Sequence, residues 1–247
     1  MQKKKLNVIV VMPAYNAEKT LEKTYNDIPK GYVSEVILVD DCSNDDTIKI
    51  AKKLGLIVIV HKKNKGYGAN QKTCYKYALG KNAEIIVLLH PDYQYDPKKI
   101  PKLIKPLKEG KADVVYGSRM LIKGAAKKGG MPWWKRIGNM ALTLYFKIFL
   151  NIKLTDVATG YIAYSRKVLE VIPFHKNSDG FTFDEEAMIQ VVAKKFKIAE
   201  IPIPTRYEDD SSSTSFPVCM RYGLNLFWKI IRYKLHKYGI KKYYLLE

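Results

Sequence analysis

Hydrophobic residues in the first half of the chain form short continuous runs that alternate with helical patterns. The apolar runs are rich in valine, isoleucine and leucine, and they lie at residues 8–11, 36–39, 57–60, 85–89 and 114–116. The helical patterns lie between them, at residues 17–27, 45–54, 70–79 and 97–109. Continuous apolar strands that alternate with helices are typical of parallel sheets covered on both faces. The sequence therefore predicts an α/β fold with a mostly parallel sheet and helices on both faces.

Two stretches in the second half have the pattern of amphipathic helices. Residues 133–150 are apolar on most sides, and their polar residues recur on one narrow stripe, at Arg136, Asn139, Thr143 and Lys147. Residues 224–238 place apolar and aromatic side chains on one face and basic ones largely opposite. Helices of this kind either pack on a core or lie in the headgroup region of a membrane. We divide the chain into a main domain, residues 1–215, and a basic amphipathic helical segment, residues 216–247.

The balance of charge narrows the range of partners. Lysine and arginine number 43 against 24 aspartate and glutamate, which gives a formal net charge of +19. Such a charge favours an anionic partner: nucleic acid, a phosphate-rich substrate or an acidic membrane surface. Nucleic acid is not expected, because no RNA-recognition signature occurs and the aromatic residues do not interleave with basic ones on a predicted sheet face.

Cysteine usage and the first residues bear on the compartment. The 3 cysteines are widely separated, which excludes a disulfide scaffold and fits a reducing compartment. The apolar run after the basic residues 1–5 is too short for a secretory signal. We expect a cytoplasmic protein that is peripherally associated with the inner face of the cell membrane.

Polar and charged residues follow four of the five predicted strands. They are Pro13, Tyr15 and Asn16 after the first run, Asp40 and Asp41 after the second, His90, Asp92 and Gln94 after the fourth, and Arg119 after the fifth. Ligands of open α/β sheets bind outside the carboxyl ends of the strands. The sequence therefore predicts a ligand site at this edge of the sheet.

Two acidic segments carry most of the candidate chemistry. Asp40 and Asp41 repel each other unless donors face them, and a nucleobase or a ribose hydroxyl would supply such donors; the alternative is an acidic turn that caps the following helix. Asp92, with the amide of Gln94 two residues on, predicts a hard-cation site, since Mg²⁺ uses one or two protein ligands and completes its shell with phosphate and water. For Asp96 and the proline after it we expect an ordinary helix start.

The order PAYN, VDDCSNDDT, HPDYQYDP and GSR resembles the family 2 glycosyltransferases with the GT-A fold. Within them it is most similar to the dolichyl-phosphate mannose synthases and related polyprenyl-phosphate sugar synthases, over residues 6–210. The resemblance implies that the nucleoside of the donor is held by Pro13, Tyr15, Asn16, Asp40 and Asp41. It implies a Mg²⁺ or Mn²⁺ ion held by Asp92 and Gln94, with His90 in place of the first acid of the family's DxD element.

The resemblance also implies roles for residues farther along the chain. Arg119 and Arg136 would bind phosphate groups, although Arg136 fits a solvated helix charge equally well. Lys72, after the glycine-rich turn at residues 64–68, would approach the diphosphate. Asp156, in the segment DVATGY, and Glu186 fall on acidic positions of the family, so Asp156, Glu186 and Arg119 are the predicted catalytic group. For Asp184 and Glu185 we expect charges that complement a helix N-terminus. Arg206 and residues 211–213 would form an acceptor loop.

The activity implied is inverting, metal-dependent transfer of a hexose from a nucleoside diphosphate sugar to a polyprenyl (dolichyl) phosphate at a membrane surface. The branch favours GDP-mannose as donor, with UDP-glucose next. An alternative keeps the donor but uses a hydroxyl of a glycan or glycolipid as acceptor, which needs a general base, whereas a phosphate does not. A nucleotidyltransferase would normally carry a glycine-rich basic loop after the first strand, where this chain has PAYN.

Overall fold

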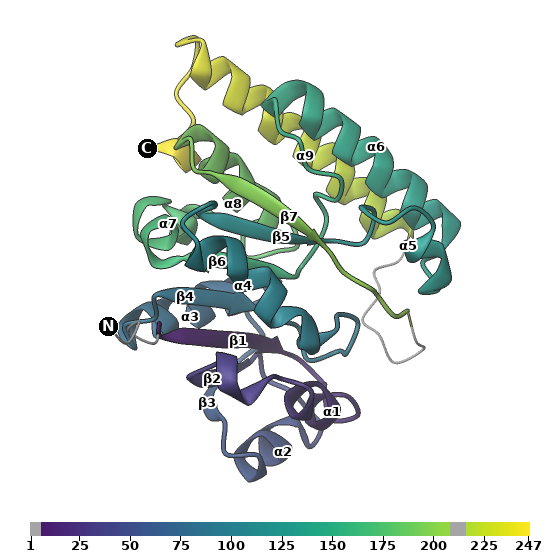
Figure 1. Cartoon of the computed structure of the whole chain (residues 1–247). Coiled ribbons are helices and arrows are strands. Elements are labelled where there is room, and N and C mark those ends of the chain that lie inside the picture. The colour runs from purple at the N-terminus through teal and green to yellow at the C-terminus, as the bar shows by residue number, and fades with distance from the viewer. Residues whose placement is uncertain (1–5, 208–215) are drawn as a thin grey trace.

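The chain forms one seven-stranded sheet with helices on both faces (Figure 1). This computed structural model describes residues 6–207 and 216–247, and the side chains of residues 216–220 are not described. The strand order is β3-β2-β1-β4-β6-β5-β7. The strands are β1 (Val8–Ala14), β2 (Glu35–Asp40), β3 (Ile57–Val60), β4 (Ile85–Leu88), β5 (Val114–Ser118), β6 (Ile162–Ser165) and β7 (Ile198–Pro202).

The predicted mostly parallel sheet is confirmed, and the five apolar runs became β1 to β5. Neighbouring strands pair in parallel except at β6, which runs antiparallel to both β4 and β5. The sequence pattern missed β6 and β7, which are only four and five residues long. Because β6 is reversed, the residues that precede it lie at the same edge as the residues that follow β4 and β5.

Alternate residues of the strands face two separate cores. Ile9 and Val11 of β1 join the core beneath α3, α6, α8 and α9, whereas Val8 and Val10 join the core beneath α1, α2 and α4. The helices are α1 (Leu21–Asn26), α2 (Thr47–Lys53), α3 (Tyr67–Gly80), α4 (Ile100–Lys108), α5 (Ala125–Lys128), α6 (Trp133–Leu150), α7 (Arg166–Val171), α8 (Phe183–Ala193) and α9 (Phe216–Lys237). Short 3₁₀ turns lie at Lys30–Tyr32, Pro97–Lys99, Phe174–Lys176 and Tyr244–Leu246. This two-sided coverage explains why the strands read as continuous apolar runs.

The two predicted amphipathic helices, α6 and α9, lie along each other beside the β5–β7 half of the sheet (Figure 1). The Tyr145 hydroxyl of α6 donates to the Phe227 carbonyl of α9 at 3.1 Å, and the two rings stack with centroids 5.2 Å apart. The α9 helix is also joined to α8 by the ion pair of Lys229 with Glu186. The predicted boundary at residue 215 lies in a segment outside the described residues and stays a prediction. Within the described part of the chain, no helix has the length and apolar character needed to cross a bilayer.

The α6 helix packs with its polar residues inward. Asn139 and Thr143, from the predicted polar stripe, are buried. Its outer face is apolar, and the exposed side chains recur at helical spacing, at Trp133, Ile137, Met140, Leu144 and Ile148. Large exposed apolar patches mark surfaces that meet a partner or a membrane.

In α9, one of the basic residues predicted to lie opposite the apolar face is buried. Lys229 is buried with Leu226 and Ile230, while Leu224 and Trp228 are exposed. The cause is the buried carboxylate of Glu186, which accepts a hydrogen bond from the Lys229 ammonium and so turns that residue inward.

The N-terminus of α3 is held against the loop before α8. The amide of Gly68 donates to the Asp179 carbonyl at 2.7 Å, and a Cβ at Gly68 would overlap the Ser178 carbonyl oxygen. Glycine is therefore required at this position by the close approach of two backbones. The contact fixes the loop at residues 177–181 beside the carboxyl ends of β1 and β2.

We expect Gly68→Ala to lower the free energy of unfolding by about 2 kcal/mol, because the added methyl group overlaps backbone that cannot give way locally. Gly80→Ala, in the last turn of the same helix and with open space around its Cβ, should raise it by about 0.5 kcal/mol. Urea unfolding followed by circular dichroism measures both values. Equal effects of the two variants would contradict the tight contact at Gly68.

Candidate active site

A cavity of about 590 Å³ lies at the carboxyl edge of the sheet, between the ends of β4 and β5 and the helices α6 and α9. One part of its wall carries charged and polar groups, at His90, Asp92, Gln94, Arg119, Asp184 and Glu185. Another part is apolar and aromatic, with Trp134, Leu142, Tyr145, Phe181, Leu224 and Phe227. The structure thus brings the residues predicted after β4 and β5 into one cavity.

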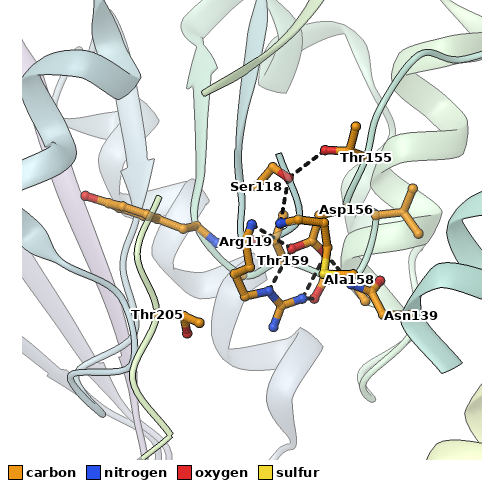
Figure 2. A network of polar contacts seen from close by, with 12 residues as sticks. Ser118, Arg119, Asn139, Thr155, Asp156, Ala158, Thr159 and Thr205 are labelled. Atoms are coloured by element: carbon orange, nitrogen blue, oxygen red, sulfur yellow. Dashed lines mark hydrogen bonds and ion pairs between the residues drawn. The ribbon is translucent and has the colours of Figure 1, made fainter. Parts of the chain in front are cut away.

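Arg119 and Asp156 form a buried ion pair at the base of this cavity (Figure 2). The Asp156 carboxylate accepts from Arg119 Nε at 2.7 Å and from Nη2 at 2.8 Å, a bidentate geometry that only arginine can offer. The backbone amide of Arg119 donates to the same carboxylate at 3.0 Å, and Asn139 of α6 donates to it at 2.8 Å. One carboxylate therefore joins the end of β5, the segment before β6 and the α6 helix.

The charge of Asp156 is stabilised by this pairing. Burial alone would raise the pKa of Asp156, but the charge and hydrogen bonds of Arg119 outweigh burial and lower it. The backbone amide of Asp156 donates to the Glu200 carboxylate of β7 at 3.1 Å, and burial raises the pKa of Glu200. Asp156 is thus fully buried and ionised, with both oxygens engaged.

Arg119 also contacts the segment that follows β7. Its Nη1 donates to the Tyr207 hydroxyl at 2.9 Å, and its Nη2 donates to the Ala158 carbonyl. The second hydrogen of Nη1 has no partner among the described residues. The guanidinium is therefore held rigidly at the cavity wall while one N–H group stays available to an anion.

The loop after β4 presents Asp92 to the cavity. Asp92 Oδ1 accepts from the Gln94 amide at 3.1 Å, and Tyr93 between them takes a left-handed conformation, with φ of 56°. The Gln94 carbonyl accepts from the Arg206 amide at 3.0 Å, so the loop is fixed from both sides. The residues 211–213 predicted beside Arg206 lie outside the described part of the chain.

The residues present fit a divalent ion of the kind that is completed by phosphate oxygens. Within residues 6–207 and 221–247, no cluster of three or more histidine, cysteine or acidic side chains could hold a metal by itself. Asp92 and His90 line the cavity together with Gln94, which supplies an amide oxygen. One carboxylate with neutral ligands suits Mg²⁺ or Mn²⁺ when a diphosphate supplies the remaining oxygens.

Protein donors satisfy the carboxylates of Asp40 and Asp41. Asp40 accepts from the amide and hydroxyl of Ser43, and Asp41 accepts from His61 Nδ1 at 2.6 Å and from two amides of residues 65–66. The chain itself therefore supplies donors to both carboxylates, so their repulsion is offset without a ligand. Their contact with a nucleoside stays a prediction.

The other residues predicted to hold the nucleoside lie beside this turn. Pro13 lies near the end of the buried strand β1. Asn16 has a φ of 50°, and its side-chain oxygen accepts a hydrogen bond from the Asn44 amide at 2.9 Å. Tyr15 is 51% exposed, so its ring is accessible to a base. None of the three is part of the cavity wall.

Lys72, Arg136 and Glu186 also lie away from the cavity wall. Lys72 donates to the Asn177 carbonyl and pairs with Asp179 at 2.7 Å, so it holds the loop before α8. Arg136 is half-buried on α6, where its neighbour Lys135 lines the cavity instead. Glu186 is fully buried and bound to Thr182 and Lys229, a contact between helices. This geometry gives no support to the catalytic role predicted for Glu186.

Asp184 and Glu185 are the cavity residues that the sequence prediction undervalued. They lie in the first turn of α8, as expected, but they are buried and line the cavity. Burial raises the pKa of Asp184 and raises that of Glu185 well above its usual range. One oxygen of each has no hydrogen-bond partner among the described residues. The aromatic residue directly before them, Phe183, was the available signal, because it is fully buried at the start of this helix.

Comparison with known proteins agrees with this geometry. Residues 9–172 match the profile of Glycosyl transferase family 2. A UDP-N-acetylglucosamine–dolichyl-phosphate N-acetylglucosaminyltransferase of Methanococcus voltae is 30% identical, over 93% of this chain and 97% of its own length. A dolichyl-phosphate hexose transferase of Haloferax volcanii is 31% identical, over 81% of this chain and 83% of its own.

Solved structures show the same architecture. Glucosyl-3-phosphoglycerate synthase from Mycobacterium tuberculosis, solved with Mn²⁺, UDP-glucose and glycerol 3-phosphate, is similar with a TM-score of 0.69 over 96% of this chain and 82% of that one. At 20% identity the likeness shows the fold alone, and it confirms the predicted GT-A fold. From the profile match, the two relatives and the fold, it follows that this chain is a glycosyltransferase and belongs to glycosyl transferase family 2.

Proposed function

We propose that this enzyme transfers a sugar from a nucleoside diphosphate sugar to a polyprenyl phosphate at a membrane surface. The observation that carries the proposal is the division of the cavity wall. Asp92 and Arg119 at the carboxyl edge suit a metal-bound diphosphate and an acceptor phosphate, whereas the rings and aliphatic groups of α6 and α9 suit an isoprenoid chain. A lipid phosphate needs both kinds of wall in one cavity.

The state of Asp156 argues against Asp156 as the general base that a hydroxyl acceptor would need. A hydroxyl acceptor needs a base with a free oxygen, but both oxygens of Asp156 are bound by Arg119 and Asn139. An acceptor phosphate is already an anion, so it attacks the anomeric carbon without losing a proton. We therefore assign Asp156 the role of positioning Arg119, and Arg119 that of binding phosphate.

The leaving diphosphate must be neutralised as its bond to the sugar breaks. The available N–H of Arg119 would donate to the diphosphate. Because the guanidinium is already held by Asp156 and Tyr207, the side chain need not reorganise during the reaction. Asp92, Gln94 and His90 would hold a divalent ion, which supplies positive charge to the diphosphate oxygens. Attack from the far side of the sugar gives inversion at the anomeric carbon.

The donor is the finer part of the proposal. The Methanococcus voltae relative is named for UDP-N-acetylglucosamine, and it covers more of this chain than the Haloferax volcanii relative named for a hexose. We therefore place UDP-N-acetylglucosamine first among donors. GDP-mannose, which the sequence favoured, and UDP-glucose follow.

The exposed apolar face of α6 supports membrane contact. Trp133 is 69% exposed and Ile148 is 65% exposed, at opposite ends of the same stripe. Leu224 and Trp228 of the neighbouring helix α9 are exposed as well, and Leu224 also lines the cavity. Apolar groups that leave water for the headgroup boundary favour binding, and the basic character of the chain adds attraction to anionic lipids.

The transfer reaction can be tested directly. With Mg²⁺ or Mn²⁺, a short polyprenyl phosphate and a panel of nucleotide sugars, we expect a lipid-linked sugar from at least one donor, detected by mass spectrometry. Glycan and glycolipid hydroxyl acceptors serve as the comparison. Transfer to a hydroxyl with none to the lipid phosphate would contradict the proposed acceptor, and no product from any donor would contradict the proposal as a whole.

Arg119→Lys should lower kcat by about 100-fold, because a point charge cannot keep the bidentate pairing and also direct an N–H group at the phosphate. Arg166→Lys is the matched control, since Arg166 on α7 pairs with Glu170 outside the cavity. Steady-state kinetics of both variants, with melting temperatures, separates lost catalysis from lost folding. Equal kcat values for a folded Arg119→Lys variant and the wild type would rule out the assigned role.

The membrane surface can be tested by replacing Ile137 and Leu144 with aspartate. Both side chains are more than half exposed, so the fold should persist, while binding to vesicles of anionic phospholipid falls at least about tenfold through lost apolar burial. The control replaces Val60 and Val171, which are exposed on other parts of the molecule. Cosedimentation with vesicles measures the binding. A similar loss in both double variants would show that α6 is not the contact surface.

A further inference from the structure

His90 occupies the position at which the resembled family carries an acidic residue. A hydrogen-bonded tyrosine, Tyr67, connects it to the carboxylate of Asp184. The Tyr67 hydroxyl lies 2.7 Å from Asp184 Oδ2 and 3.2 Å from His90 Nε2. We propose that Asp184 and Tyr67 are positioning residues that fix His90 with its Nδ1 lone pair available to the divalent ion, and that this nitrogen ligand selects Mn²⁺ over Mg²⁺. The inference rests on the metal-assisted reaction proposed above and extends it to the choice of metal.

The direction of the hydrogen bonds follows from the number of hydrogens. Asp184 Oδ2 also accepts from Gln71 Nε2 at 3.3 Å, so this oxygen acts as an acceptor toward both neighbours. The single hydrogen of the Tyr67 hydroxyl therefore points to Asp184, over the shorter of its two distances. The phenolic oxygen can then only accept from His90, which places the imidazole hydrogen on Nε2.

The ring of His90 is also held in place sterically. It stacks on the Tyr67 ring, with centroids 5.5 Å apart and planes inclined by 13°. On another side it meets Gly160, where a Cβ would lie 2.7 Å from His90 Nε2. Glycine at position 160 thus leaves room for the ring. No described residue bonds Nδ1, and His90 lines the cavity together with Asp92.

Tyr67 and Asp184 are placed as the residues behind a metal-binding histidine usually are. Metal-bound histidines usually donate their other N–H to a carboxylate or another acceptor, which fixes the tautomer and the orientation of the ring. Here the acceptor is a tyrosine that is itself bonded to a buried carboxylate. Mg²⁺ takes oxygen ligands and keeps several waters, whereas Mn²⁺, a first-row transition metal, also accepts a nitrogen ligand in a site otherwise built from oxygen. A histidine in place of an acid therefore favours Mn²⁺.

The tautomer can be measured in the metal-free protein by ¹⁵N-resolved NMR of the histidine side chains, with His90 assigned through His90→Gln. We expect the hydrogen on Nε2. A hydrogen on Nδ1 would overturn the proposal, and this result depends on no disruptive variant.

Metal binding tests the outer shell. Mn²⁺ affinity is measured by electron paramagnetic resonance in the presence of UDP and, separately, of GDP, with Mg²⁺ as competitor. Tyr67→Phe and Asp184→Asn should each weaken Mn²⁺ binding about tenfold, while His90→Asp should lower the preference for Mn²⁺ over Mg²⁺ by about tenfold. Tyr164→Phe, in a buried tyrosine outside the cavity wall, should change neither quantity.

The outcomes separate the two proposals. If the wild type binds Mn²⁺ with a diphosphate but the Tyr67, Asp184 and His90 variants match it, the inference about His90 fails and the proposed transferase stands. If neither nucleotide brings a divalent ion to the wild-type protein, the metal dependence of the proposed function fails, and the inference fails with it. Melting temperatures of the variants show whether any loss reflects unfolding.

Discussion

At the end of β5, Arg119 carries a guanidinium charge into the interior, where Asp156 compensates it through two parallel hydrogen bonds. Removing one partner of such a buried pair typically costs about 3–5 kcal/mol, because the other charge is left without compensation. The same carboxylate accepts a hydrogen bond from Asn139 of α6, and the same guanidinium donates one to Tyr207 in the segment after β7. The relative placement of the sheet edge, α6 and that segment thus depends on one ion pair.

The reversed strand β6 explains how these parts come together. In a wholly parallel sheet, the segment before a strand lies at the edge opposite to the site. Because β6 is antiparallel to β4 and β5, the segment that carries Asp156 and Gly160 enters the sheet beside His90 and Arg119. The antiparallel direction of β6 therefore places Asp156 beside Arg119, with which it pairs, and Gly160 beside the His90 ring, for which it leaves room.

The sequence predicted the features that depend on local pattern. Continuous runs of valine, isoleucine and leucine marked β1 to β5, and the polar residues after them marked the site edge. It could not show which acid pairs with which base: Asp156 and Arg119 are 37 residues apart, and nothing in their spacing indicates a contact. The same limit hid the burial of Asp184 and Glu185, since acidic residues in a first helical turn look alike whether solvent or an aromatic wall faces them.

The α6 helix buries two polar residues and leaves a stripe of apolar ones exposed, and this too depends on a distant partner. Asn139 turns inward because Asp156 offers it an acceptor, and it is buried together with Phe146 and Leu150, while the apolar side chains of the opposite face are left outside. A pattern analysis finds the stripe of polar residues, but it cannot tell which side of the helix the protein covers.

The cavity is assembled from stretches of chain that meet only in the folded protein. Its polar wall comes mainly from strand ends and the loops beside them, and its apolar wall from α6 and α9, which lie outside the sheet. Under the proposed function, substitutions in the two helices would change the length or branching of the lipid that fits without disturbing the groups that bind the donor. Relatives built on the same sheet are free to diverge in acceptor while keeping one chemistry of sugar release.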